Sequence, residues 1–338
     1  MKRSSITVAD IADWQNLVAA AYRAAQGKRE RPEIRAFFER FDENLARLHR
    51  QIRDGTVPVG VAVRFQIRDP KPRVIHAPCF PERVLHHAVI AQVGPVLDRA
   101  LVFDTYACRT GKGALAAVLR AQQHVRRFAW YAKMDIRSYF ASIDHVILQE
   151  LLQRRFKNAD VLQLLARIID SHRDAPGRGL PIGALTSQHF ANWYLDGFDR
   201  LLLGRCRVRG MIRYMDDVVW WCDGREQVRA VHAAAQSYLR ETLRLDIKPP
   251  VQIQRSAQGV RVCGFRVLPG TILLSLRRRR RYAHARRRWE QAFARGAIDG
   301  LQLQAGYASA LAITAHADAA SWRREQLHRC PPEPCCES

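Results

Sequence analysis

The chain has 338 residues, 48% of them hydrophobic, so it can build a large core and is not a disordered protein. Its 55 Lys and Arg outnumber 32 Asp and Glu, and the formal net charge is +23. An enzyme for small molecules rarely needs such an excess, which suits a polyanion such as nucleic acid. No apolar run approaches the ~18 residues that span a membrane, and no signal peptide is evident. We therefore expect a cytoplasmic protein without membrane contact.

The eight cysteines favour the same compartment. The first five lie scattered in apolar contexts and are expected to be small buried residues of a reducing cytoplasm. The tail, "CPPEPCCES", contains the adjacent pair Cys335 and Cys336, which fits no common tetrahedral zinc spacing. A frayed tail is therefore expected there rather than a metal site.

The first third of the chain is predicted to be mainly helical. Residues 11–53 carry apolar side chains at helical spacing, and Gly55 closes the pattern. Residues 57–76 alternate, with "RDPKPR" as a turn, which predicts a β-hairpin with a basic tip. A helix is predicted over residues 81–100, and "YACRTGKGALAAVLRAQQHV" is predicted to be a loop entering a helix.

The rest of the chain alternates between strands and helices, which predicts the α+β class. An apolar β-prone run covers residues 128–136, and "GMIRY" and "VVWWC" are predicted strands joined by the turn "MDD". A further hairpin is predicted to turn at Pro269-Gly270, and the remainder is helical and rich in Arg. The other predicted helices cover residues 144–156, 161–172, 225–243, and a stretch from Ser187 to about Leu203.

Three carboxylates stand at the ends of these predicted strands. Asp135 ends one strand, and Asp216 and Asp217 occupy a hairpin tip farther along the chain. If both elements pair in one sheet, the three side chains converge, and their mutual repulsion needs compensation. Two Mg²⁺ ions would supply it and would support nucleotidyl transfer. Asp pairs are also common in solvated turns, but apolar strands flank this one.

Seven blocks then resemble the reverse transcriptases, in the order of that family and over roughly residues 60–270. They are "PKPRVIHAPCFPERVLHHAV" (70–89), "YACRTGKGALAAV" (106–118), "KMDIRSYFASIDH" (133–145), "GLPIGALTSQHFANWYLDGFD" (179–199), "YMDD" (214–217), "LDIKPP" (245–250) and "VCGFRVLP" (262–269). The resemblance implies a polymerase right hand with fingers, a palm of antiparallel sheet packed on helices, and a helical thumb. The implied domains are an N-terminal helical extension (1–56), fingers (57–130), palm (131–270, with a fingers insertion at about 150–180), and thumb with C-terminal tail (271–338).

The fourth block narrows the resemblance further. Retron and group II intron enzymes usually carry Pro-Gln-Gly followed by Ser-Pro, whereas this chain has Pro181-Ile182-Gly183 followed by Thr-Ser-Gln. "IGALTSQ" resembles the reverse transcriptases of diversity-generating retroelements. That resemblance implies cDNA synthesis on a template RNA from dNTPs, frequent errors at template adenines, and a small basic accessory protein.

The same resemblance implies the catalytic centre. Asp135, Asp216 and the backbone of Ile136 would hold two Mg²⁺ ions, and Asp217 would complete the acidic cluster. Around the incoming nucleotide, Arg73 would meet the triphosphate, with Lys71 as a second candidate and Arg109 and Lys112 as weaker ones. The remaining nucleotide-binding candidates are Phe140, which would exclude a 2′-hydroxyl; Ile182, which would hold the base pair loosely; and Lys248, a candidate proton donor to pyrophosphate.

Template and primer contacts are expected from three regions. In the fourth block, Gly179 and Gly183 would allow close backbone approach, and polar side chains would hydrogen-bond to nucleic acid. Gly264 and Phe265 resemble a primer grip. The Arg-rich stretch from Arg277, "RRRRRYAHARRRW", has eight arginines in the twelve positions to Arg288 and is expected to grip the template–primer duplex. The candidates are Gly183, Ser187, Gln188, Asn192, Gly264, Phe265, Arg277, Arg278, Arg280, Arg281 and Arg287.

Each of these residues also has an ordinary structural interpretation: Phe140 and Ile182 as packing residues, Lys248 as an exposed lysine, and the Arg-rich stretch as a solvated basic face. Other readings of the whole chain are an antiphage-defence or retron-like reverse transcriptase, a group II intron maturase, and a catalytically silent RNA-binding protein on a polymerase scaffold. The complete acidic trio argues against the silent protein. About fifty residues follow Arg288, so an extension of the maturase type is not expected.

Overall fold

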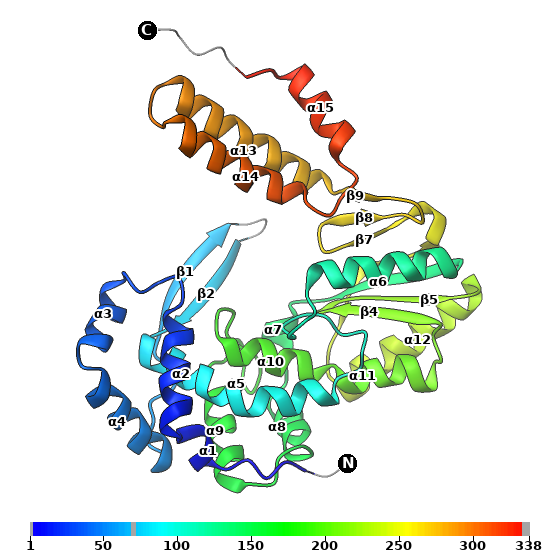
Figure 1. The fold of residues 1–338 in the computed structure, drawn as a ribbon. Coiled ribbons are helices and arrows are strands. Elements are labelled where there is room, and N and C mark those ends of the chain that lie inside the picture. Colours follow the sequence, from blue (N-terminus) through cyan, green and yellow to red (C-terminus); the bar gives the residue numbers. More distant parts are fainter. Residues whose placement is uncertain (1–2, 69–71, 333–338) are drawn as a thin grey trace.

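The computed structural model describes residues 3–68 and 72–332. The chain passes from a helical N-terminal region through a protruding hairpin into a four-stranded sheet with helices on both faces, and it ends in a small sheet followed by helices (Figure 1). The paired strands of all three sheets are antiparallel. The α+β class predicted from the sequence is confirmed.

The N-terminal region divides into separate helices where the sequence pattern suggested one helical stretch. Asp13 accepts a hydrogen bond from the backbone N–H of Asn16 at 2.9 Å and so starts a new helix. Pro32 occupies the first turn of the next one, where its missing N–H is tolerated. The helices are α1 (Val8–Ala12), α2 (Trp14–Ala25), α3 (Pro32–Glu39) and α4 (Phe41–Arg53).

The predicted β-hairpin is present as β1 (Ala62–Arg68) and β2 (Pro72–Pro78). It projects away from the helical body toward the C-terminal helices in Figure 1. Its tip, including the candidate Lys71, lies outside the described residues. Every residue of β1 is exposed, and Val63 retains 68% of its accessible surface. The alternating apolar residues therefore identified a strand correctly but do not face a core.

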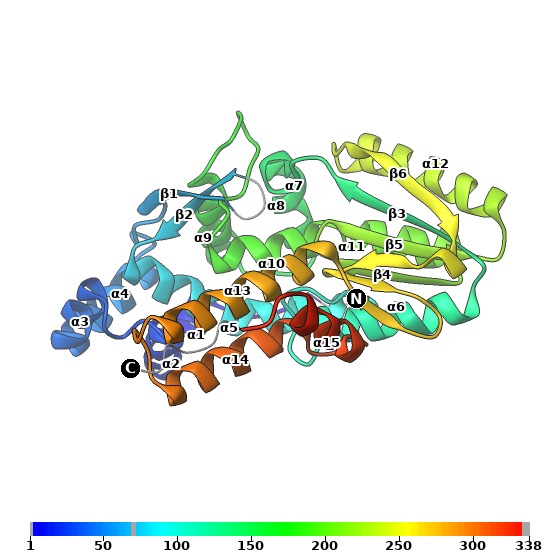
Figure 2. The ribbon, with the colours of Figure 1, turned by 90° about the horizontal axis from the view of Figure 1, so that it is seen from above.

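The central sheet has the strand order β4 (Gly210–Tyr214), β5 (Asp217–Cys222), β3 (Trp130–Ile136), β6 (Ile247–Arg255). Alternate side chains of its strands enter two different clusters. Tyr131 and Trp221 pack with α6 (Ala114–Arg127), whereas Ala132 and Trp220 pack on the side of α12 (Arg225–Thr242). The two helices cover opposite faces of the sheet in Figures 1 and 2. This burial on both faces explains the continuous apolar run after Asp217.

A helical layer joins this sheet to the hairpin. It contains α5 (Phe80–Ala100), α7 (Tyr139–Ser142), α8 (His145–Gln153), α9 (Ala159–Asp170), α10 (Leu185–Tyr194) and α11 (Asp196–Arg200). The helix predicted from Ser187 to about Leu203 is interrupted: α11 follows α10 after Leu195, and a π-helical turn, Leu201–Arg205, comes next. The polar residues that this layer buries matter for the site described below.

The last predicted hairpin is a three-stranded sheet of β7 (Val260–Val262), β8 (Phe265–Val267) and β9 (Ile272–Leu274). It is followed by α13 (Leu276–Ala294), α14 (Gly300–Thr314) and α15 (Ala320–Arg329). α13 and α14 lie side by side in both ribbon views. Gly306 permits this pairing, because a Cβ there would lie 2.3 Å from the Trp289 ring.

The cysteines follow their prediction only in part. Cys222 is buried, Cys79, Cys206 and Cys263 are half-buried, and Cys108 is exposed, contrary to expectation. Each of these five thiols is free. Cys335 and Cys336 lie outside the described residues. Within residues 3–68 and 72–332, none of the helices combines the length and apolarity needed to cross a lipid bilayer.

Candidate active site

The two strands β4 and β5 present Asp216 at the end of the central sheet. Tyr214 pairs with Asp217, so Met215 and Asp216 form the connecting turn. Met215 adopts a φ of 61°, a left-handed conformation that is unusual for a residue with a side chain. β5 pairs with β3 up to Met134 and Val218, which brings Asp135, the next residue of β3, to the same end. The predicted pairing of these elements in one sheet is confirmed, and it places the three aspartates at the same end of that sheet.

The carboxyl groups of Asp135 and Asp216 interact directly. Burial, together with the charge of the neighbouring Asp135 and a hydrogen bond between the two side chains, raises the pKa of Asp216 to about 7. A buried carboxyl beside a second carboxylate ionises less readily than an exposed one, so without a cation Asp216 keeps its proton to a higher pH. The arrangement concentrates negative charge that a bound cation would relieve.

The carboxylates of Asp217 and Asp135 each have a lysine partner. Nζ of Lys133 donates to Oδ2 of Asp217 at 2.8 Å, and Nζ of Lys248 donates to Oδ2 of Asp135 at 3.0 Å. Burial raises the pKa of Asp217, and the Lys133 ammonium opposes that rise. Asp217 therefore occupies a different environment from Asp216, although the two are adjacent in sequence.

A buried polar network lies behind the turn. Arg213, on β4, is completely inaccessible to solvent and forms an ion pair with Asp199 of α11 at 2.7 Å. The same guanidinium donates to the side chain of Asn192 at 2.8 Å and to the carbonyl of Met215 at 3.2 Å. The sequence offered one signal for this network that our predictions did not use: an arginine inside the otherwise apolar strand "GMIRY".

Comparison with known proteins assigns this arrangement to a family. Residues 67–265, more than half of the chain, match the family model described as reverse transcriptase (RNA-dependent DNA polymerase). The chain belongs to this reverse transcriptase family. The mixed helices and antiparallel sheets agree with the right-hand polymerase fold of this family. Following the division predicted from the sequence, we call the central sheet with its helices the palm, the β1–β2 hairpin part of the fingers, and α13–α15 the thumb.

Individual relatives are distant. The group II intron-encoded protein LtrA of Lactococcus lactis subsp. cremoris is 22% identical over 173 residues, covering 48% of this chain and 28% of LtrA. Protein YkfC of Escherichia coli (strain K12) is 24% identical over 143 residues, covering 39% of this chain and 38% of YkfC. The chain thus spans well under half the length of these relatives. A solved structure of apo telomerase from Candida tropicalis, truncated from its C-terminal domain, aligns with a TM-score of 0.47, 11% identity and coverage of 65% of this chain and 56% of that chain.

The acidic residues of this reverse transcriptase fit a divalent cation in part. Asp135 and Asp216 supply oxygen donors, and a hard cation would displace the proton that the raised pKa of Asp216 retains. One oxygen of Asp217, Oδ1, is buried without a hydrogen-bond partner. In the described ranges, however, no three acidic, histidine or cysteine side chains are already gathered as a ready-made ligand set. Asp217 faces Lys133 instead, and the backbone of Ile136 as a ligand remains a prediction.

The nucleotide-binding candidates sit on segments that are joined to one another. Arg73 is exposed on β2. The N–H of His76, also on β2, donates to the carbonyl of Ile182 at 2.8 Å, and the N–H of Leu180 donates to the carbonyl of Phe140 at 2.9 Å. Phe140 and Ile182 are both half-buried. The fingers hairpin, the loop before α10 and the short helix α7 therefore form one continuous hydrogen-bonded wall.

The two weaker candidates for triphosphate binding, Arg109 and Lys112, bond to other residues of this chain. Arg109 forms an ion pair with Asp98 at 2.5 Å and donates to backbone carbonyls. Lys112 donates to the carbonyl of Phe103 at 2.7 Å, and its Nζ lies 3.3 Å from the centroid of that ring. Both cations therefore hold the loop before α6 in place, and the structure does not offer them to a triphosphate.

Several residues of the fourth block that were predicted to contact the template pack against other parts of this chain. Gly183 has a φ of 123°, and a Cβ there would lie 2.6 Å from the His76 carbonyl, so the close backbone approach at Gly183 is to β2. Gly183 is exposed, and its contact with the template stays a prediction. Ser187 and Asn192 are each 2% exposed. Gln188 is exposed and accepts from the Cys108 thiol at 3.3 Å. The expected template contacts of Ser187 and Asn192 are inconsistent with this burial, and Gln188 remains a candidate.

The candidate primer grip is packed against the thumb. Gly264 has a φ of 81°, and a Cβ there would lie 2.8 Å from Nε of Arg278. The Arg278 guanidinium lies over the Phe265 ring at 4.1 Å and donates to the carbonyl of Ile313 at 3.1 Å. Phe265 itself is 3% exposed. Phe265 and Arg278 therefore fasten the small sheet to the thumb helices, contrary to the direct nucleic-acid contacts predicted for them.

The other arginines of α13 differ in their exposure to solvent. Arg277, Arg280, Arg281 and Arg287 are exposed on α13, as a nucleic-acid contact requires. A groove at the start of this helix is lined by Arg261, Arg266, Arg277 and Arg279. This basic surface agrees with the predicted grip on a duplex.

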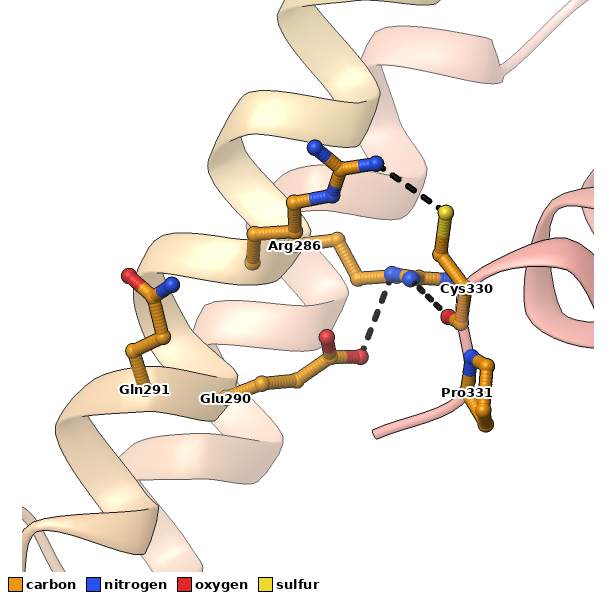
Figure 3. Close-up of a pocket in the computed structure, with 6 residues that line it drawn as sticks. Arg286, Glu290, Gln291, Cys330 and Pro331 are labelled. Atoms are coloured by element: carbon orange, nitrogen blue, oxygen red, sulfur yellow. Dashed lines mark hydrogen bonds and ion pairs between the residues drawn. The ribbon is translucent and has the colours of Figure 1, made fainter. Parts of the chain in front are cut away.

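Arg286 is the exception within the Arg-rich stretch. It is only 3% exposed, although a core helix was not expected to bury arginine. Figure 3 shows it reaching from α13 toward Cys330, whose carbonyl accepts its hydrogen bond. Nε of Arg286 lies 3.2 Å from Glu290 one turn later, so the burial is compensated by an ion pair.

Proposed function

We propose that this chain is an RNA-directed DNA polymerase that synthesises cDNA on a template RNA. One observation carries the proposal: in a member of the reverse transcriptase family, Asp135 and Asp216 meet at the end of the palm sheet with a pKa of about 7 for Asp216. The exposed arginines of α13 and the net charge of +23 support a nucleic-acid substrate. The division into fingers (57–130), palm (131–270) and thumb (271–338) belongs to the same proposal.

In the proposed mechanism, Asp135 and Asp216 would hold two Mg²⁺ ions, which would activate the primer 3′-hydroxyl and stabilise the departing pyrophosphate. Lys133 bonds to Asp217 and opposes the rise in its pKa that burial causes. Lys248, which lies 3.0 Å from Asp135, would protonate pyrophosphate. Arg73 on the exposed hairpin binds the triphosphate, and Phe140 in α7 lies beneath the sugar and excludes a 2′-hydroxyl.

A primer-extension assay tests this activity. The full chain is incubated with poly(rA)/oligo(dT), dTTP and Mg²⁺, and the products are compared with those of Asp135→Asn and Asp216→Asn. Both variants keep the side-chain shape but lose the charge, so we expect extension to be abolished while the circular dichroism spectrum is unchanged. Asp223→Asn is the matched control, because Asp223 is exposed and pairs with Arg209 on the surface. Full extension by Asp216→Asn would refute the proposed role.

We further propose that the enzyme belongs to the diversity-generating type and miscopies template adenines with the help of a small basic accessory protein. Pro181-Ile182-Gly183 supports this assignment, because Ile182 stands where other reverse transcriptases carry a hydrogen-bonding Gln. A near-copy repeat beside the gene, differing at adenines, would be expected in its genome. A toxin-like partner or a structured RNA beside the gene would instead indicate the antiphage-defence type.

A further inference from the structure

The buried guanidinium of Arg213 bonds to the turn that carries Asp216. Nη1 of Arg213 donates to the carbonyl of Met215 at 3.2 Å, and Met215 directly precedes Asp216. Met215 has a left-handed φ of 61°. A non-glycine residue persists in this conformation only where its surroundings hold it there. The hydrogen bond from Arg213 is such a restraint, because it acts on the peptide that carries the unusual dihedral.

The guanidinium is itself held in a fixed orientation. Nε and Nη2 both donate to the carboxylate of Asp199, at distances of 2.7 to 2.9 Å, and both side chains have no accessible surface. Thr105 donates its hydroxyl to the same carboxylate at 3.0 Å. A charge pair this deeply buried is stable only with its hydrogen bonds satisfied, so the plane of the guanidinium cannot turn freely.

Asn192 links the same guanidinium to two other segments. Its side-chain oxygen accepts from Nη1 at 2.8 Å, and its backbone carbonyl accepts from Nη2 at 2.9 Å. Its amide nitrogen donates to the carbonyl of Ala107 at 2.8 Å, in the loop that leads to α6. Asn192 lies on α10, which begins directly after the loop of Ile182 and Gly183. The network therefore joins the substrate-side loop to the turn that carries Asp216.

We propose that Arg213 and Asn192 are positioning residues that set the place of Asp216 relative to Asp135, and thereby the affinity of the acidic pair for its metal ions. This inference rests on the proposed function. Neither residue touches substrate, since both are buried behind the turn. Displacing the Met215 peptide would move the Asp216 carboxyl away from Asp135, which faces it on the neighbouring strand.

Two variants of the full chain test the proposal. Arg213→Lys keeps a positive charge opposite Asp199, but a single ammonium cannot bond to Asp199, Asn192 and Met215 together. Asn192→Leu has a similar shape and removes the side-chain hydrogen bonds. Arg200→Lys is the control for the same substitution on α11, because the half-exposed Arg200 pairs with Asp196 at 2.8 Å outside the network.

Mn²⁺ binding without nucleic acid is measured by electron paramagnetic resonance, beside kcat and KM for dTTP. We expect both test variants to lose about 10–100-fold in Mn²⁺ affinity and in kcat, with little change in KM. Both should also melt at a lower temperature than wild type, because buried polar groups lose their partners. The control is expected to behave like wild type.

Wild-type Mn²⁺ affinity in both folded test variants would overturn the proposal, as would an equal loss in Arg200→Lys. If Arg213→Lys does not fold, Asn192→Leu decides the question. A wild type that binds Mn²⁺ but extends no primer would refute the proposed function, while the Mn²⁺ affinities would still judge the two residues.

Discussion

Lys133 on β3 and Asp217 on β5 form an ion pair of 2.8 Å across the palm sheet. Nζ of Lys133 also donates to the carbonyl of Arg261, on β7, at 2.6 Å. One ammonium therefore connects the acidic end of the palm to the small sheet that supports the thumb. The pair also explains why Asp217 stands apart from the Asp135–Asp216 pair, although it is the neighbour of Asp216 in sequence.

The first prediction concerns the stability that this pair provides. Lys133→Met leaves the half-buried Asp217 carboxylate without its partner and removes a donor from the Arg261 carbonyl. We expect the free energy of unfolding to fall by about 1–3 kcal/mol, measured by urea denaturation at pH 7. Adding Asp217→Asn should recover part of the loss, because the unpaired charge is then gone.

An exposed ion pair provides the control for these measurements of unfolding free energy. Arg209 and Asp223 lie 3.1 Å apart with both side chains more than half exposed. Arg209→Met should change the free energy of unfolding by less than about 1 kcal/mol. Additive effects of Lys133→Met and Asp217→Asn would show that the two residues do not interact in solution.

The second prediction follows from the pKa of Asp216, raised from 3.8 to about 7 by burial and by Asp135. Between these values the folded state binds the proton more tightly than the unfolded chain does. The stability of the metal-free protein therefore falls as the pH rises through this window, by about 1.4 kcal/mol per pH unit at most. Asp216→Asn removes this dependence, so the variant should gain stability relative to wild type at pH 8 more than at pH 5.

Urea denaturation in EDTA at both pH values measures the difference between the two proteins. Because each is compared with itself across pH, other titrating groups, such as the buried His86 and His124, contribute equally to both. Mg²⁺ should restore wild-type stability at pH 8 and have a smaller effect on the variant. An unchanged difference in stability between pH 5 and pH 8 would contradict the raised pKa of Asp216.

The sequence located the acidic centre correctly because strand ends and turns leave local signals. Apolar runs on either side of Asp216 and Asp217 predicted two strands, and the structure pairs the second of them with the strand that carries Asp135. The burial and the partners of polar side chains could not be predicted in this way. Asn192 and Arg278 look like surface residues in their motifs, yet one bonds to Arg213 and the other stacks on Phe265.

Which cations a fold buries depends on partners that are distant in sequence. Arg213 finds Asp199 in α11, and Arg286 finds the carbonyl of Cys330 beyond α15. Neither partner can be identified from helical or strand periodicity. The β1 strand shows that a correct alternating pattern identifies a strand without identifying what covers it, because every residue of β1 is exposed.

The third prediction concerns sugar selection by Phe140. The ring is half-buried in α7, five residues after Asp135, and makes an edge contact with Tyr139 at 5.8 Å between ring centroids. Phe140→Val shortens the side chain and opens space for a 2′-hydroxyl. We expect discrimination against ribonucleotides, measured as the ratio of kcat/KM for dTTP and UTP, to fall by about 10–100-fold. An unchanged ratio would favour an ordinary packing role.

The fourth prediction concerns fidelity at Ile182. An aliphatic side chain cannot hydrogen-bond to a nascent base pair, whereas Gln can. Ile182→Gln should therefore reduce misincorporation opposite template adenine more than opposite the other bases, as read by sequencing of cDNA from a mixed template. The backbone of Ile182 accepts its hydrogen bond from His76 in either case, so the loop should keep its place. Equal adenine error rates in both enzymes would dismiss the idea.

The fifth prediction separates two kinds of thumb arginine on one helix. Arg281 is exposed, whereas Arg278 is half-buried over Phe265 and bonded to the carbonyl of Ile313. Arg281→Gln should weaken binding of an RNA–DNA hybrid and lower the slope of log K against log salt by about one, without changing stability. Arg278→Gln should instead lower the free energy of unfolding by about 1–3 kcal/mol, because it leaves buried partners unsatisfied. Fluorescence anisotropy at several salt concentrations, together with urea denaturation, measures both effects. An equal salt slope in Arg281→Gln and wild type would show that this face of α13 does not contact the phosphate backbone.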